Sequence, residues 1–291
     1  MDWSRWRRRA EKLRNHPRPL RFAASRVLWH SGLSHFFIAE LGDGLRVRFF
    51  PSSISAALWV EKDARNEDAE FLELVLRAGD TYVDCGANIG HLALVARRRV
   101  GETGAVTAIE ANPRIFRYCA ENLKLNHFTD VRALHLALGE THGEITISDH
   151  RADDQNRVGA GSTEVPMRPL DEVLDDSAVT LLKLDVEGFE VAVLRGAPRT
   201  LGSTSLVYCE LSASNSARFG FRPAEAERLL VDAGFLLVQR TATEWTLSER
   251  GVFETLSAAD HPRTGYNLVA VRRTFVPELT ARLAARGVRV S

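Results

Sequence analysis

The fold of this chain is decided by Thr81-Tyr82-Val83-Asp84-Cys85-Gly86-Ala87-Asn88-Ile89-Gly90. A short β-prone run ends there in an acidic residue and a glycine-bearing turn, and the apolar pattern of a helix follows. Such a strand–turn–helix unit receives a nucleotide-like cofactor at the carboxyl edge of a parallel sheet. The glycines have no Cβ, so the backbone can turn sharply and approach a ligand closely. The stretch therefore predicts an α/β fold with a cofactor at this turn.

The spacing of the glycines indicates which cofactor fits. A dinucleotide fingerprint, Gly-x-Gly-x-x-Gly, places a helix N-terminus against a pyrophosphate. Here three residues separate Gly86 from Gly90, and Asp84 precedes them. S-adenosylmethionine (SAM) has no phosphate and carries an ammonium group, which suits that carboxylate. Glu110 ends a second apolar run twenty residues after Gly90, where an acid can accept both ribose hydroxyls. The alternative is a plain turn without a ligand.

Three motifs resemble the class I SAM-dependent methyltransferases, and more narrowly the FkbM family. They are VDCGANIG at 83–90, EANP at 110–113 and LKLDVEGFE at 182–190, the last continued by VLRGA at 193–197. The likeness spans roughly residues 80–211. It implies methyl transfer, often to a hydroxyl of a sugar, glycan or polyketide, and leaves the acceptor open. It also implies cofactor contacts at Asp84, Gly86, Ala87, Asn88, Gly90, Glu110, Ala111 and Asn112, and at Ala137 and Leu138, where the wider fold touches the adenine.

Acidic side chains follow two of the predicted strands. Asp185 and Glu187 come after the apolar run 179–184, and Glu210 lies in the run 206–211. A helix is expected over 190–201, between these two runs. Charges at the end of an apolar strand are costly unless they are paired or used, and the carboxyl edge is where open α/β sheets bind ligands. These three residues are the predicted catalytic carboxylates. The alternative is a network around Lys183 that only braces the sheet.

Methyl transfer to oxygen needs a general base within hydrogen-bond reach of the acceptor hydroxyl. Asp185 or Glu187 can serve, or can hold a divalent metal that lowers the pKa of the hydroxyl. His150, in the polar loop 149–162, is the fourth catalytic candidate, and His91 is a weaker one. Asn156 in the same loop is a candidate contact to acceptor or cofactor. The metal requirement is left open.

Composition is that of an ordinary globular protein. The 291 residues are 45% hydrophobic, and 38 basic residues balance 38 acidic ones, so no overall field attracts nucleic acid. Three cysteines without zinc-like spacing favour reduced thiols and a cytoplasmic location. We expect an N-terminal extension over 1–66 and a methyltransferase domain over 67–291. The domain is predicted to be Rossmann-like, with a mostly parallel sheet, helices on both faces and an antiparallel edge.

The N-terminal extension is strongly basic. Residues 3–14 have the pattern of an amphipathic helix. The segment from Arg5 to Arg26 contains nine Lys and Arg residues and a single acidic residue, Glu11. This predicts contact with an anionic membrane surface or a glycolipid; the alternative is a helix that packs its tryptophans on the domain. Pro17 and Pro19 interrupt the pattern, and residues 36–41 and 45–50 are predicted to pair as a hairpin. By analogy with related folds, such an extension covers the acceptor pocket.

The leading functional hypothesis is a SAM-dependent O-methyltransferase that acts on a small hydroxylated molecule. Nucleic-acid methylation is disfavoured by the zero net charge and by the lack of an Asn-Pro-Pro-aromatic motif. A non-catalytic scaffold of the same fold is disfavoured because Asp84, Glu110 and Asp185 are intact. A nicotinamide oxidoreductase is disfavoured by the glycine spacing. A homo-oligomer is left open.

Overall fold

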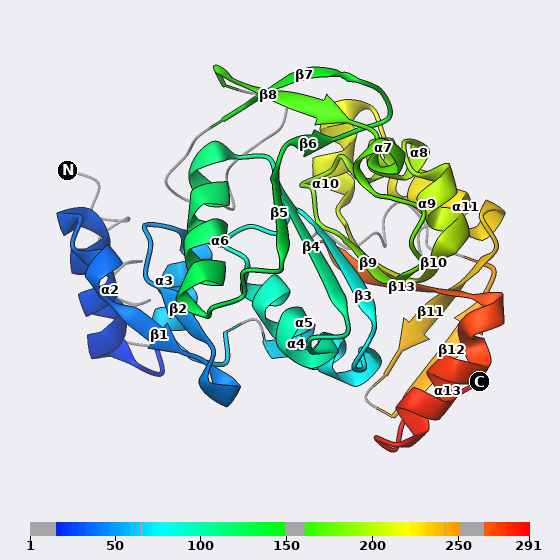
Figure 1. Cartoon of the computed structure of the whole chain (residues 1–291), viewed down its shortest axis with the longest axis horizontal. Coiled ribbons are helices and arrows are strands. Elements are labelled where there is room, and N and C mark those ends of the chain that lie inside the picture. The colour runs from blue at the N-terminus through cyan, green and yellow to red at the C-terminus, as the bar shows by residue number, and fades with distance from the viewer. Residues whose placement is uncertain (1–15, 65, 149–160, 242, 251–264) are drawn as a thin grey trace.

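The computed structural model describes residues 16–64, 66–148, 161–241, 243–250 and 265–291. Its centre is a nine-stranded sheet of order β14-β12-β11-β13-β10-β9-β3-β4-β5 (Figure 1). The strands are β3 (Thr81–Cys85), β4 (Ala105–Glu110), β5 (Arg132–His135), β9 (Val179–Leu184), β10 (Thr204–Leu211), β11 (Phe235–Arg240), β12 (Glu244–Ser248), β13 (Tyr266–Arg272) and β14 (Arg289–Val290). Strands β10, β9, β3, β4 and β5 run parallel, and β13 is antiparallel to β10 and β11. The predicted mostly parallel sheet with an antiparallel edge is confirmed.

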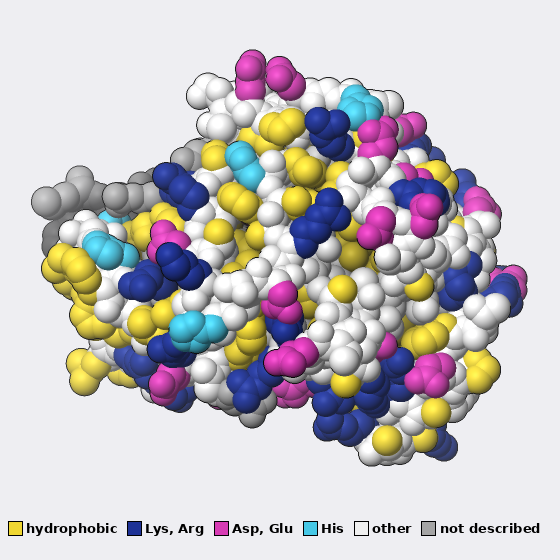
Figure 2. Space-filling view, viewed as in Figure 1, with side chains coloured by type: hydrophobic (Ala, Val, Ile, Leu, Met, Phe, Trp, Pro, Cys, Tyr) yellow, Lys and Arg dark blue, Asp and Glu magenta, His cyan; other side chains and the backbone are white. Residues whose placement is uncertain are grey.

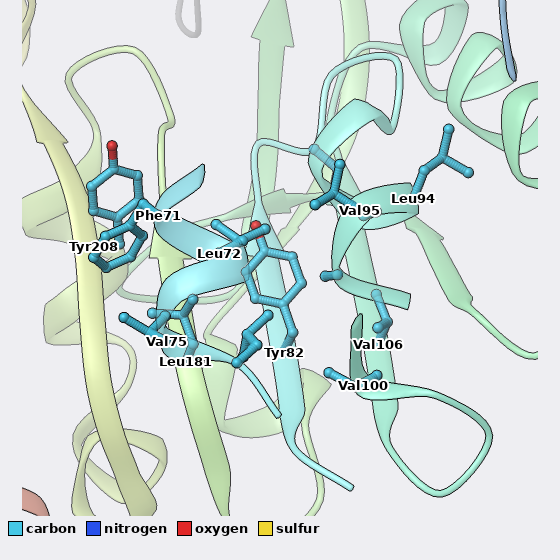
Figure 3. Close-up of a cluster of buried hydrophobic side chains, with 14 of the residues drawn as sticks. Phe71, Leu72, Val75, Tyr82, Leu94, Val95, Val100, Val106, Leu181 and Tyr208 are labelled. Atoms are coloured by element: carbon cyan, nitrogen blue, oxygen red, sulfur yellow. The ribbon is translucent and has the colours of Figure 1, made fainter. Parts of the chain in front are cut away.

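Helices cover both faces of the sheet. The first face carries α4 (Asn66–Val75), α5 (His91–Val100), α6 (Pro113–Leu125) and α13 (Val276–Ala284), and the second carries α7 (Leu170–Val173), α8 (Glu190–Arg195), α9 (Pro198–Ser203) and α11 (Pro223–Asp232). Tyr82 belongs to the core of the first face and Val83 to that of the second, because neighbouring strand residues point to opposite faces. Figure 3 shows the first core, with Leu72 of α4 beside Tyr82 and Phe71 of the same helix against Tyr208.

The N-terminal extension packs beside this sheet. It contains α2 (Pro19–Ser31), β1 (Ile38–Glu40), β2 (Arg46–Arg48) and α3 (Ser53–Val60). Strands β1 and β2 form the predicted hairpin. Pro19 was expected only to interrupt the helical pattern before it. In the structure it is the first residue of α2, a position where its missing N–H costs nothing. Val47 and Leu58 share the core of the first face. The boundary at residue 66 stays a prediction, and the predicted helix over 3–14 lies outside the described residues.

Two local predictions were wrong or incomplete. The helix expected over 190–201 is two helices, α8 and α9, because Pro198 starts a new helix. Gly196 lies between them, and a Cβ there would be 2.1 Å from the carbonyl oxygen of Gly139. A second sheet, β6-β8-β7, joins β6 (Ala137–Leu138), β8 (Thr163–Arg168) and β7 (Gly143–Ile147). No strand was predicted over residues 163–168, and a proline such as Pro166 is uncommon inside a strand.

Short elements complete the described chain: α10 (Ala213–Ser216) and the 3₁₀ turns η1 (Ser34–Phe36), η2 (Gly42–Gly44), η4 (Ala217–Phe219) and η5 (Arg273–Phe275). No helix in the described ranges has the length and apolar character needed to cross a bilayer.

Candidate active site

A cavity of about 440 Å³ lies where β3, β4, β9 and β10 end, at the carboxyl edge of the sheet. Open α/β sheets bind their ligands at this edge. The cavity brings together seven of the predicted cofactor residues: Gly86, Asn88, Glu110, Ala111, Asn112, Ala137 and Leu138. Three of the predicted catalytic residues, Asp185, Glu187 and Glu210, line it as well. Residues far apart in the sequence thus meet around one space.

The loop after β3 is held tightly against its neighbours. The N–H groups of Gly86 and Ala87 both donate to the carbonyl oxygen of Ile109, each at 2.9 Å. Gly86 has a φ of +85°, and a Cβ there would lie 1.9 Å from the carbonyl oxygen of Asp185. Asn88 also has a positive φ, 50°, and its Oδ1 accepts a hydrogen bond from the N–H of Ile89 at 2.7 Å. Only glycine fits at position 86, because both the φ angle and the space exclude a side chain.

Gly90 and Asn122 support the loop from outside the cavity. Gly90 precedes α5, and a Cβ there would meet Cys119 Sγ of α6 at 2.8 Å, so its role is close helix packing. The buried amide of Asn122 donates to the carbonyl oxygen of Ile89 at 2.9 Å and accepts from the N–H of Arg48 at 2.9 Å. Asn122 was not among the predicted site residues. No local pattern marks a side chain that joins the loop to β2.

Glu110 is oriented by two backbone groups at the end of β4. Its Oε2 accepts from the N–H of Asn88 at 2.9 Å, and its Oε1 accepts from the N–H of Asn112 at 2.8 Å. A carboxylate oxygen can accept a second hydrogen bond, so this arrangement fits the two ribose hydroxyls of SAM. Asn112 caps α6, since its Oδ1 accepts from the N–H groups of Arg114 and Ile115.

We expect Glu110→Gln to weaken binding of S-adenosylhomocysteine (SAH) by about 10- to 100-fold, since hydrogen bonds to a charged group are worth about 1.5–3 kcal/mol. In the variant, one carboxylate oxygen is replaced by an NH₂ group, which cannot accept a hydrogen bond. One of the two hydrogen bonds from the backbone N–H groups of Asn88 and Asn112 is therefore lost. Calorimetric titration measures the change. Glu121→Gln, an exposed substitution on α6, is the matched control and should bind SAH like the wild type. Equal affinity of the two variants would remove Glu110 from the site.

Asp84 and Asp185 share one buried cation. Lys183 Nζ lies 3.1 Å from Asp185 Oδ2 and 3.6 Å from Asp84 Oδ1. Burial raises the pKa of Asp84, and the ammonium of Lys183 opposes that shift. Burial lowers the pKa of Lys183, but the carboxylates of Asp185 and Asp84 outweigh it and raise that pKa above its ordinary value. The network around Lys183 therefore exists, and Asp185 also faces the cavity.

Asp84 borders a small hollow beside the main cavity. Neither of its carboxylate oxygens accepts a hydrogen bond from the part of the chain that the structure describes. The hollow of about 30 Å³ is also lined by Asp185 and by His91, the first residue of α5. A buried carboxylate with unused acceptor capacity, next to the cofactor loop, fits the ammonium end of SAM. His91 borders this hollow and not the main cavity, which separates it from the candidate bases.

Glu187 is a cavity-lining carboxyl group with a raised pKa. It follows β9 with a φ of +56°, and its Oε2 accepts a hydrogen bond from Asn215 Nδ2 at 3.0 Å. Burial, together with the nearby carboxylates of Asp185, Glu210 and Glu190, raises the pKa of Glu187 to about 8. Strained backbone and shifted pKa values gather at functional sites. A carboxylate titrating near the working pH is suited to general-base catalysis.

Glu190 fixes the turn that carries Glu187. Its Oε1 accepts from the N–H groups of Val186 and Gly188, at 3.1 and 3.0 Å, and burial raises its pKa to about 7. Gly188 has a φ of +102°, and a Cβ there would be 2.4 Å from the backbone of Asn215. Glu190 was named only as the last residue of the motif at 182–190, without a role of its own, and Asn215 was not predicted. Their roles follow from contacts that the sequence does not reveal.

The N-terminal extension contributes to the cavity wall, and its predicted role as a cover of the acceptor pocket stays a prediction. Ser53, Ile54 and Ala57 of α3 line the cavity.

His150 and Asn156 lie outside the described residues. Across the described ranges, no three His, Cys, Asp or Glu side chains are placed to hold a metal ion.

The family model described as Methyltransferase FkbM domain matches residues 84–237. Hexuronic acid methyltransferase AglP from Haloferax volcanii is 30% identical over 205 residues, which cover 67% of this chain and 80% of that protein.

Two solved structures are similar at a lower level. The methyltransferase FkbM of Methylobacillus flagellatus has a TM-score of 0.39 and 16% identity, covering 90% of this chain and 60% of that one. A SAM-dependent O-methyltransferase of Thermotoga maritima has a TM-score of 0.41 and 16% identity, covering 72% and 70%.

Proposed function

The chain belongs to the FkbM family of methyltransferases, and we propose that it transfers the methyl group of SAM to a hydroxyl group of a sugar or another small hydroxylated molecule. SAM-dependent methyl transfer follows from the family, whereas the hydroxyl acceptor is the proposal. The observation that supports it is Glu187, a cavity-lining carboxyl group whose pKa is raised to about 8. The Haloferax relative, by its name, acts on a hexuronic acid, which favours a sugar.

In this proposal each residue has a simple task. Bound SAM supplies a methyl group that is already activated for transfer. Glu110 and the Gly86 loop hold the cofactor, and correct positioning of the reactants contributes about 7–11 kcal/mol. Glu187 accepts the proton of the acceptor hydroxyl, a task worth about 10²–10⁴-fold in rate. Asn215 orients Glu187 through the hydrogen bond to its Oε2.

A hydroxyl is a better acceptor for this cavity than a carboxylate. A hexuronic acid offers both kinds of oxygen. The cavity wall carries the carboxyl groups of Glu110, Asp185 and Glu210 besides that of Glu187, and like charges repel an anionic acceptor group. A carboxylate acceptor also needs no base, which would leave the shifted pKa of Glu187 without a role. The product expected here is a methyl ether.

The test is methyl transfer from isotope-labelled SAM to a panel of neutral sugars, hexuronic acids and polyketide-type alcohols, with RNA and DNA included for comparison. We expect the label to enter a sugar and to survive mild alkali, which hydrolyses methyl esters and leaves methyl ethers intact. An alkali-labile product would overturn the hydroxyl assignment, and transfer to nucleic acid alone would overturn the small-molecule assignment.

A further inference from the structure

The exposed large apolar side chains of the described residues are confined to one segment. They are Leu20, Val27, Leu33, Phe36, Phe37 and Ile38, all within the extension. Leu20 is 86% exposed and Val27 69% exposed. Scattered single apolar residues on a surface are ordinary, whereas a cluster of them marks an interaction site. We call this cluster, together with Arg18, Arg21 and Arg26, the α2 surface.

Part of the α2 surface is the outer side of a packed helix, and its other apolar residues lie in the segment that follows α2. Leu20 and Val27 are seven residues apart, two helical turns, and so share one side of α2. The other side packs inward, where Trp29 joins a small core with Phe49 and Ala56. Figure 2 shows apolar side chains at the end of the molecule where Figure 1 places α2. The helix is therefore ordered by its inner side, and its outer side is presented to the surroundings.

Positive charge accompanies these apolar side chains. Residues 16–38 contain Arg18, Arg21 and Arg26 and no acidic residue. Arg21 lies over the ring of Trp59 and Arg26 over that of Phe22, each at 5.0 Å, while Arg18 donates to the carbonyl oxygen of Val60 at 3.3 Å. Within the described ranges these arginines contact rings and a carbonyl, not carboxylates. Their charge remains available to an anionic partner.

We propose that the α2 surface docks on an anionic lipid bilayer. The apolar side chains enter the boundary between head groups and acyl chains, and the arginines bind lipid phosphates. A second copy of this chain is a poorer partner, because a symmetric contact places the same surface, with the same arginines, on both sides. The preceding residues 1–15 add Arg5, Arg7, Arg8, Arg9, Lys12 and Arg14 against Asp2 and Glu11, which strengthens attraction to anionic lipid. The proposal is independent of the methyl acceptor.

The test is co-sedimentation of the full chain with vesicles of phosphatidylcholine, with or without phosphatidylglycerol. Binding is expected with the anionic vesicles and should weaken as salt screens the charges. Leu20→Gln with Val27→Gln should weaken binding about tenfold or more, since less apolar surface is buried. Arg18→Gln with Arg26→Gln should weaken it about fivefold for each arginine removed.

The matched control is Arg222→Gln with Arg289→Gln, which removes the same charge from side chains that are 79% and 78% exposed elsewhere. It should change binding less than about twofold. Circular dichroism and SAH titration establish that each variant is folded. The proposal is overturned if the wild type does not co-sediment with anionic vesicles, or if the α2 variants and the control variant bind these vesicles equally well. It is also overturned if the α2 variants instead dissolve a dimer in sedimentation velocity.

Discussion

Gly86→Ala is expected to weaken SAH binding at least about 100-fold and to lower the free energy of unfolding by about 3 kcal/mol or more. The new Cβ would lie 1.9 Å from the carbonyl oxygen of Asp185 and 2.8 Å from its carbonyl carbon. Backbone atoms cannot rotate away as a side chain can. Either the cofactor loop or the turn after β9 must therefore move. Calorimetric titration with SAH and denaturant unfolding measure the two effects.

Gly79→Ala is the matched control for backbone strain. Gly79 also has a φ of +85°, but the nearest atom to its added Cβ is Thr103 Oγ1 at 3.8 Å, an ordinary contact. This variant carries only the cost of a left-handed alanine, about 1–2 kcal/mol, and should bind SAH like the wild type. If Gly86→Ala behaves like Gly79→Ala, the close approach to Asp185 is not a constraint on the loop.

The sequence predicted those parts of the fold that local patterns encode. Strand β3 and the start of α5 follow from an apolar run, an acid and two glycines, and the structure has them as expected. The break between α8 and α9 was missed although Pro198 is a local signal for it; the close packing of Gly196 against Gly139, which is distant in sequence, could not be predicted. The addition of β14 beside β12 also depends on a distant pairing. Such contacts leave no periodic signal in the sequence.

In the candidate site, too, the residues marked by local patterns were predicted, and those that depend on distant contacts were not. Glu110, Asp185 and Glu187 were identified because acidic residues follow apolar strands, and the carboxyl ends of parallel strands meet at one edge. Lys183 was recognised as a partner of the carboxylates. The sequence could not show that one ammonium would contact both Asp84 and Asp185. Glu190 and Asn215 were missed because their function is to hold other residues, through contacts that only the folded chain creates.

Glu187→Gln is expected to lower kcat about 10²–10⁴-fold, the usual contribution of a general base. The amide has nearly the same size as the carboxyl group, so the cavity and SAH affinity should be preserved. Steady-state kinetics with the identified acceptor measures kcat, and calorimetry measures SAH binding. Glu210→Gln makes the same chemical change at another cavity-lining residue and should cost less than about tenfold. Equal losses in the two variants would mean that Glu187 is not the base.

The pH dependence of the rate separates a base from a merely structural carboxylate. The pKa of Glu187 is raised to about 8, mainly by burial, so below that pH most molecules hold the proton that a base must lack. With both substrates below saturation, the rate should rise about tenfold per pH unit toward pH 8 and then level off. Glu187→Gln should abolish this rise.

Asn215→Ala also tests the assignment of Glu187 as the general base, because it removes the hydrogen-bond donor to that residue. Asn215 Nδ2 donates to Glu187 Oε2, and a hydrogen bond donated to a carboxylate stabilises its charged form. Removing the donor should therefore raise the pKa of Glu187, and the rising limb of the rate profile should move to higher pH while the plateau is largely kept. A lower plateau with an unmoved limb would instead mean that Asn215 only supports the turn. A limb that survives in Glu187→Gln would assign the proton to another group.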